Sequence, residues 1–324
     1  MTDFPHNIIT CFIMGKIILC LLLIFGLSGF ANEPFVYVDI NECKAKYFEL
    51  LGKARACENG ESVERNEEEA FRYYYKAATN YAYSEPQALE RLKQKANEGN
   101  FYAEYYLAMY YHDHGQIMTY DPGKAFYWAN RAAQKNYVRA IDYLAWCYIK
   151  GDGVGVDKKK GGELLLKAAE LGFARSQYHV AMCYTEIPPR VPTAYKGVFK
   201  ANYSDAIYWY KKAADQGDLP AKYDLGVCYF YGLGVPEDKS KAVEIWESMA
   251  KELCGQSKED IEKPGIALSR CYYYGWGCEK DEKKSFDVFP LGNTPKMKAN
   301  LYRILIVDKK RRYNTINFGY DPRP

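Results

Sequence analysis

Apolar and small residues recur along the chain in one fixed order. In the clearest copy, Ala221, Leu225 and Tyr229 follow one another at four-residue spacing. This spacing places the three side chains on one stripe of an α-helix. Gly232 and Gly234 come next, and glycine tolerates the positive φ at which helices commonly end. The pattern predicts a helix that is buried along one stripe and closed by a glycine turn.

A second apolar pattern follows each glycine turn. Alanine is followed three residues later by an aromatic or aliphatic residue and then by an alanine pair, as in Ala206, Trp209, Ala213 and Ala214. Gly217 closes this segment. Each unit is therefore predicted to be a helix, a glycine turn and a second helix.

The unit is repeated along most of the chain. The residues aligned with Leu225 are Leu107, Leu144, Val180 and Leu268, and successive copies are separated by 37, 36, 45 and 43 residues. A period near 40 is typical of stacked helix pairs that bury a continuous core between neighbours. A small residue follows the key position in every copy and would let the partner helix approach closely: Ala108, Ala145, Ala181, Gly226 and Ser269.

The ends of the repeat region are less regular. A first copy around Leu51 lacks a clear glycine pair, and Ser84-Glu85-Pro86-Gln87 predicts the start of an extra helix. An insert runs from 185 to 201, and a short capping helix is expected over 297–307. We expect three parts: a leader over 1–31, the repeats over 32–290, and a cap helix and tail over 291–324.

These motifs resemble those of the Sel1-like repeat family, a branch of the tetratricopeptide-like α-solenoids. The resemblance rests on Leu225-Gly226, on Gly232-Leu-Gly234-Val235 and on Lys212-Ala213-Ala214-Asp-Gln-Gly217, and it covers roughly residues 47–290. It implies an all-α, right-handed α-solenoid of about six helix-turn-helix repeats. It also implies an adaptor or regulatory role.

The N-terminal segment has the features of a secretory signal peptide. Lys16 precedes an apolar run from Ile17 to Phe30 that is too short for a comfortable membrane span, and Gly29 and Ala31 are small residues at the cleavage positions. We expect export to the periplasm or the medium, with cleavage after Ala31 and no membrane insertion afterwards. An uncleaved N-terminal anchor is the alternative.

The cysteines divide into two groups. Cys147, Cys183, Cys228 and Cys271 all lie three residues after the key position and are expected to be mostly buried thiols. Cys254, Cys271 and Cys278 flank one turn and form the more plausible disulfide set in an exported chain. Cys43 and Cys57 would be about 21 Å apart on one continuous helix, so they should not bond to each other.

Motifs that could carry catalysis are weak. His112-Asp113-His114 lacks the further ligands that a metal site needs. Ser248 and Lys251 match a Ser-x-x-Lys motif of penicillin-binding enzymes, but the companion Lys-Thr-Gly is absent. Lys and Arg number 44 against 41 acidic residues, so the charge gives no argument for nucleic-acid binding. We expect no catalysis, no metal and no cofactor.

A surface is the remaining candidate for function. Positions −5, −1, +2 and +6 from each key residue form one face of the first helices, and this face mixes aromatic residues with Arg and Met, as interaction hot spots do. The candidate protein-binding residues are Tyr102, Tyr106, Met109, Tyr143, Trp146, His179, Met182, Asp224, Arg270 and Tyr274. The face also includes Asp113, Arg139, Lys150, Arg175, Glu186, Val227, Tyr231 and Lys263.

The sequence therefore favours an exported, non-catalytic scaffold or adaptor that binds one or more proteins. A periplasmic immunity protein that neutralises a toxic effector is one alternative. A cell-wall or β-lactam hydrolase is another, and a Lys-Thr-Gly motif or a second cysteine in each repeat would have favoured it.

Overall fold

The computed structural model describes residues 40–79, 86–113, 120–185, 195–252 and 258–287, and these residues form helices and turns without a strand. The predicted leader, the capping helix over 297–307 and the residues Ser84 and Glu85 lie outside the described residues. The helices are α2 (Ile40–Asn59), α3 (Glu67–Ala78), α4 (Pro86–Asn97), α5 (Phe101–His112), α6 (Pro122–Gln134), α7 (Val138–Lys150), α8 (Lys158–Glu170), α9 (Ala174–Tyr184), α10 (Tyr203–Asp215), α11 (Leu219–Tyr231), α12 (Lys239–Glu252), α13 (Lys258–Tyr274) and α14 (Glu282–Asp287).

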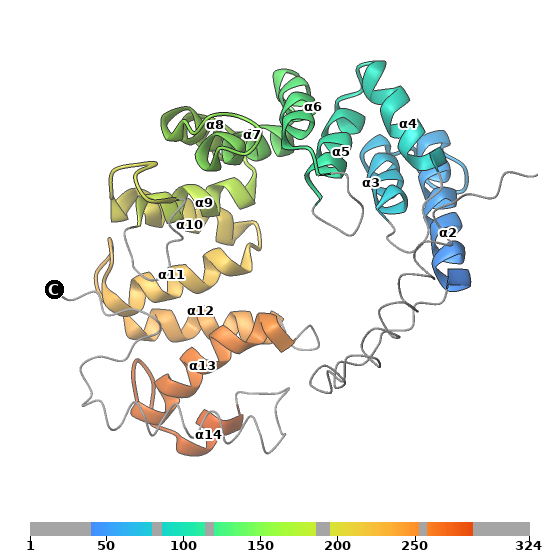
Figure 1. The fold of residues 1–324 in the computed structure, drawn as a ribbon. Coiled ribbons are helices and arrows are strands. Elements are labelled where there is room, and N and C mark those ends of the chain that lie inside the picture. Colours follow the sequence, from blue (N-terminus) through green and yellow to red (C-terminus); the bar gives the residue numbers. More distant parts are fainter. Residues whose placement is uncertain (1–39, 80–85, 114–119, 186–194, 253–257, 288–324) are drawn as a thin grey trace, which may run out of the picture.

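The helices follow one another as a solenoid of pairs, as predicted. Six successive pairs run from α2–α3 to α13–α14, and α4 is the extra helix expected between the first pair and the second. Figure 1 shows the pairs arranged along a curve, with α3 and α5 on its inner side and α4 and α6 on its outer side. Extensive contacts join helices that are consecutive in the sequence, together with α3 and α5.

The ends of the helices are set by the residues that the sequence places there. The first turns of α3, α6, α8 and α10 are capped by the side chains of Asn66, Asp121, Asp157 and Asn202, which accept backbone N–H groups. Helices α7 and α11 end at Gly151 and Gly232, both in the left-handed conformation.

The second glycine of the turn brings neighbouring repeats together. A Cβ atom on Gly153, in the α7–α8 turn, would lie 2.0 Å from the carbonyl oxygen of Pro122 at the start of α6. A Cβ atom on Gly234, in the α11–α12 turn, would lie 2.6 Å from the carbonyl carbon of Tyr203 at the start of α10. Each of these turns therefore rests on the backbone of the previous repeat's second helix.

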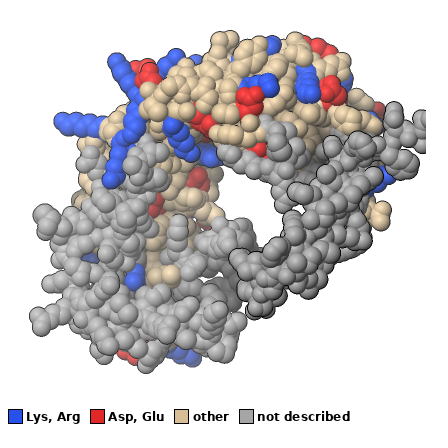
Figure 2. Space-filling view, in the orientation of Figure 1, with Lys and Arg blue, Asp and Glu red and all other residues tan. Residues whose placement is uncertain are grey.

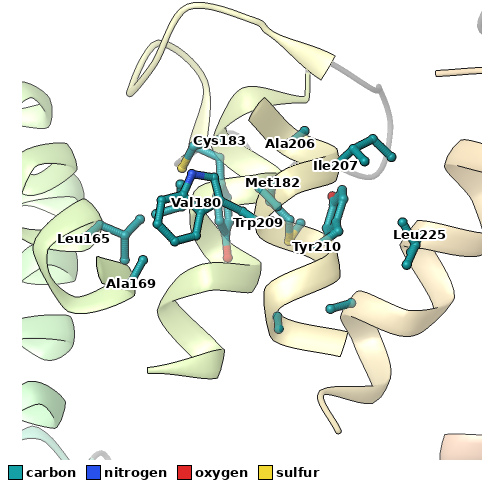
Figure 3. Close-up of a cluster of buried hydrophobic side chains, with 14 of the residues drawn as sticks. Leu165, Ala169, Val180, Met182, Cys183, Ala206, Ile207, Trp209, Tyr210 and Leu225 are labelled. Carbon is teal, nitrogen blue, oxygen red and sulfur yellow. The ribbon is translucent and has the colours of Figure 1, made fainter. Parts of the chain in front are cut away.

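The core is a series of buried clusters along the curve. Figure 3 shows one of them, to which Leu165 of α8, Val180 of α9 and Tyr210 of α10 contribute. The small residues after the key positions are buried where the helices meet, as expected: Ala108, Ala145, Ala181, Gly226 and Ser269. A Cβ atom on Gly226 would lie 2.3 Å from Nε1 of Trp246, so this contact requires glycine.

The cysteines confirm the buried column and show no disulfide among the described residues. Cys147, Cys183, Cys228 and Cys271 are buried thiols that form no disulfide, and burial raises the pKa of Cys147 and of Cys183 to about 12. Cys278 is a free thiol as well, so the structure has no Cys271–Cys278 bond, and Cys254 lies outside the described residues. Cys43 and Cys57 lie on the single helix α2 and are not bonded to each other.

Candidate interaction surface

The predicted face occupies the first helices α5, α7, α9, α11 and α13, and its residues differ in exposure. Tyr106, Met182 and Arg270 are buried, and Figure 3 shows Met182 among the core side chains. The other candidates are partly exposed: Tyr102, Met109, Tyr143, Trp146, His179, Asp224 and Tyr274.

The further members of the face also divide by exposure. Arg139, Lys150 and Arg175 are exposed, whereas Asp113 and Tyr231 are half-buried and Val227 is buried. Glu186 and the side chain of Lys263 lie outside the described residues.

At the N-terminal end of the face, tyrosines of α3 and α5 and the tyrosine that precedes α7 form a series of ring contacts. The ring of Tyr75 on α3 stacks on Tyr106 of α5 with centroids 5.9 Å apart, and Tyr102 and Tyr105 each lie 5.2 Å from Tyr137, which precedes α7. The Tyr137 hydroxyl donates a hydrogen bond of 3.0 Å to Glu68 of α3.

Glu68 also pairs with a cation of this face. Nε of Arg139 on α7 lies 3.0 Å from Oε1 of Glu68. This ion pair therefore connects α3 with α7.

In the middle of the face, α7 and α9 meet through an aromatic cluster formed by Trp146, His179 and Tyr195. The Trp146 ring is 5.0 Å from the His179 ring and 4.9 Å from the Tyr195 ring, and both contacts are edge-to-face. Tyr195 Oη lies 2.7 Å from Nδ1 of His179. Burial, reinforced by Arg175 and then Lys150, lowers the pKa of His179 to about 3, so this imidazole is neutral at physiological pH.

Toward the C-terminal end, the contacts become more polar. The Tyr178 hydroxyl on α9 donates a hydrogen bond of 3.2 Å to Oδ2 of Asp224 on α11, and burial raises the pKa of Tyr178. Tyr274 stacks on Trp276 with centroids 4.7 Å apart. Contacts therefore link α3 with α5, α5 with the start of α7, α7 with α9, and α9 with α11.

Several residues of this surface were not predicted from the sequence. Tyr195 belongs to the insert that breaks the repeat, so no repeat position marked it. Glu68, Tyr137 and Tyr178 lie in repeats but at positions other than the four that defined the face. Tyr178 directly precedes the predicted residue His179, and this was the one sequence feature that could have indicated that Tyr178 belongs to the surface.

The candidate catalytic motifs do not assemble. Nδ1 of His112 lies 3.3 Å from Oδ2 of Asp152, His114 lies outside the described residues, and the described residues contain no group of three metal-ligating side chains. The Ser248 hydroxyl is exposed on α12 and donates a long hydrogen bond of 3.4 Å to Glu252. None of the helices in the described ranges is long and apolar enough to span a bilayer.

A cleft of about 610 Å³ lies between α2, α3 and α4, away from the predicted face. Two of its charged groups satisfy each other, because Glu58 pairs with Arg91; Glu58 also accepts a hydrogen bond of 2.8 Å from the Tyr74 hydroxyl. This network is best explained as packing between the first repeat and the extra helix α4.

Two curated proteins are similar in sequence to part of this chain. An uncharacterised Sel1-like repeat-containing protein of Schizosaccharomyces pombe is 27% identical over a match covering 38% of this chain and 25% of that protein. The DAP3-binding cell death enhancer 1 of Rattus norvegicus is 26% identical over 29% of this chain and 16% of its own length. The matched part of the chain thus spans a quarter or less of the length of each of these two relatives.

Solved structures share the fold. A protective antigen of uropathogenic Escherichia coli strains, described as displaying an SLR fold, superposes with a TM-score of 0.54 at 23% identity, covering 85% of this chain and 53% of that one. A Sel1 repeat protein of Oxalobacter formigenes gives a TM-score of 0.50 at 22% identity, covering 78% and 88%.

The family model supplies the assignment. The Sel1 repeat matches residues 50–80, 101–137, 138–173, 195–218, 219–252 and 266–287, which together make up more than half of the chain. Three of these segments each contain one complete helix pair, α5–α6, α7–α8 and α11–α12, whereas 195–218 contains α10 without α9. The chain therefore belongs to the Sel1 repeat family.

Proposed function

We propose that this protein is an exported, non-catalytic scaffold that binds a protein partner on the face of its first helices. Sel1 repeats are typically protein-interaction scaffolds, which supports the general role. The observation that carries the proposal is the line of aromatic contacts that joins α3 to α5, α5 to the start of α7, and α7 to α9. Its partly exposed members are Tyr75, Tyr105, Trp146 and His179. Large, partly exposed aromatic residues contribute most to binding when a partner buries them.

The central test is the substitution of Trp146. Trp146→Ala should weaken binding of the captured partner by at least about 2 kcal/mol, the usual hot-spot threshold, while helicity and melting temperature stay close to wild type. Tyr208→Ala is the matched control, because Tyr208 is an aromatic residue that is 50% exposed but lies on the second helix α10. Binding is measured with residues 32–324 against a partner isolated from an extract of the exported fraction.

Two results would contradict this binding site. If Trp146→Ala unfolds the repeats and the remaining folded protein binds with unchanged affinity, Trp146 belongs to the core alone. If Tyr208→Ala weakens binding as much as Trp146→Ala does, the face of the first helices is not the determinant.

Export is a separate part of the proposal and has its own test. A fusion of residues 1–31 to a reporter that is active only outside the cytoplasm should be exported and processed, because Lys16 and the apolar run that follows have the composition of a signal peptide. Mass spectrometry of the secreted full-length product should find Asn32 as its first residue. An intact N-terminus retained in the membrane would support an anchor.

A further inference from the structure

Two cations flank the aromatic cluster of Trp146, His179 and Tyr195. Lys150 lies one turn after Trp146 on α7, and its Nζ is 5.5 Å from the centre of the Trp146 ring. Arg175 lies one turn before His179 on α9, and its Nε donates a hydrogen bond of 3.4 Å to Nε2 of that imidazole. The edge-to-face contact of Trp146 with His179 joins the two pairs, so both cations lie beside one aromatic cluster.

Neither cation is neutralised by an ion pair in the part of the chain that the structure describes. Both side chains are exposed, and no carboxylate among the described residues lies within ion-pair distance of either. The two carboxylates whose charged form is favoured by Arg175, Asp142 and Asp218, already have donors of their own. Asp142 accepts a hydrogen bond of 2.6 Å from Ser176, and Asp218 accepts one of 2.8 Å from the backbone N–H of Ala221.

The cluster also contains a donor that no described residue satisfies. Nε1 of Trp146 is buried and has no hydrogen-bond partner within the described ranges. A buried donor without an acceptor costs about 1–3 kcal/mol, so a native structure that keeps one has a feature to be explained. The other polar atoms of the cluster are used, since Nδ1 of His179 contacts Tyr195 and Nε2 contacts Arg175.

Resting on the proposed function, we propose that this cluster binds a carboxylate side chain in an extended acidic segment of the partner protein. A carboxylate between Lys150 and Arg175 would gain charge-assisted hydrogen bonds from both, and a small rotation of the Trp146 ring would let one oxygen accept the Nε1 proton. An apolar residue next to the carboxylate would cover the aromatic rings. His179 stays neutral beside the two cations and therefore adds no third charge that would have to be desolvated.

The direct test follows the Trp146 indole proton by NMR. The probes are a short peptide containing Leu-Glu-Glu-Leu and its Leu-Gln-Gln-Leu analogue, added to ¹⁵N-labelled residues 32–324. Trp146→Phe identifies the indole N–H resonance. The Glu peptide should shift that resonance downfield, as expected for a new hydrogen bond to a carboxylate, and the Gln analogue should leave it in place.

Charge-reversal variants locate the site by fluorescence anisotropy with the labelled Glu peptide. Arg175→Glu and Lys150→Glu should each weaken binding by about tenfold or more, because each removes a hydrogen bond between charged groups. Arg175→Lys should retain most of the affinity. The matched control is Lys159→Glu, which reverses a charge at an exposed position on the second helix α8 and should leave binding nearly unchanged. Circular dichroism of each variant confirms that the repeats remain folded.

Three outcomes would overturn the inference: equal binding of the Glu and Gln peptides, equal weakening by Lys159→Glu, or an indole resonance that does not respond. These outcomes are distinguishable from failure of the proposed function. If the captured partner requires Trp146 but binds Arg175→Glu as tightly as wild type, the binding face stands and the acidic-segment inference falls.

Discussion

At the scale of single residues, His179 shows how burial in the repeat stack changes side-chain chemistry. Its imidazole is packed against Trp146, Tyr178 and Tyr195, and Arg175 and Lys150 add positive charge nearby. Desolvation and the two cations both disfavour the protonated form, which is why the pKa falls to about 3 from an ordinary value of 6.5. The native state therefore prefers neutral His179 over the whole range between these values.

This shift predicts a loss of stability in mild acid. The unfolded chain protonates this imidazole near pH 6.5 and the folded chain only near pH 3, so the contribution of His179 is fully present above pH 6.5 and is lost as the pH falls toward 3. The slope from this residue approaches about 1.4 kcal/mol per pH unit. Urea unfolding followed by circular dichroism at pH 7, 6 and 5 measures it.

His179→Gln is the control, because the amide still offers polar groups to Tyr195 and Arg175 but does not titrate. Carboxylates that titrate in the same range are common to both proteins and cancel in the comparison. The variant should lose less stability than wild type between pH 7 and 5. Parallel profiles for the two proteins would show that His179 is not held neutral by the fold.

At the scale of helices and turns, the features that recur in every repeat could be predicted from the sequence, and the features of the irregular insert could not. The stripe at Ala221, Leu225 and Tyr229, the glycine pairs and the alanine pairs all follow from helix geometry, and the structure confirms the helices that they predict. Tyr195 could not be placed, because its position depends on how an irregular insert folds back onto α7 and α9. Whether Met182 is packed or exposed could not be predicted either, since helical periodicity gives the face of a helix but not what covers it.

Ion pairs between helices also vary from repeat to repeat. Three residues before the key position, Glu104 is fully buried on α5 and lies 2.9 Å from Arg131 of α6 and from Lys135, which directly follows α6. At the equivalent position on α11, Lys222 contacts Glu252 of α12 at 2.7 Å, with the charges reversed. The acid lies on the first helix in one repeat and on the second helix in the other. A first helix from one of these repeats would therefore place like charges together if it packed on the second helix of the other, and this disfavours the wrong pairing.

The glycine turns give a prediction at this scale. An alanine in the left-handed region costs about 1–2 kcal/mol, and Gly234 has a φ of +70°. Gly234→Ala should destabilise the protein by clearly more than this, because the new Cβ would also clash with the backbone of Tyr203. Gly217→Ala is the matched control, since φ is +86° there but a Cβ atom meets nothing within 4 Å. Thermal unfolding of both variants measures the difference. Equal losses would mean that the turn can move away from α10.

At the scale of the whole molecule, the buried clusters are separate and follow the order of the sequence. One is built from α2, α3, α4 and α5, and another from α11, α12 and α13. In both, the main contacts join helices that are close in sequence, so stability is expected to be roughly a sum of local terms. Such a molecule opens from the damaged repeat outward, and distant repeats keep their structure.

A core substitution near one end tests this behaviour. Trp246 of α12 is fully buried between Tyr223, Phe230 and the neighbouring helices, so Trp246→Ala should remove about 3–5 kcal/mol from the local stability. Hydrogen exchange should become faster in α11, α12 and α13 while α2 to α5 keep their wild-type protection. Leu92→Ala, at a fully buried position of α4, should give the reverse pattern. If either substitution instead lowered protection equally in all helices, the repeats would unfold as one cooperative unit, and the separate clusters seen along the curve would not be independent in energy.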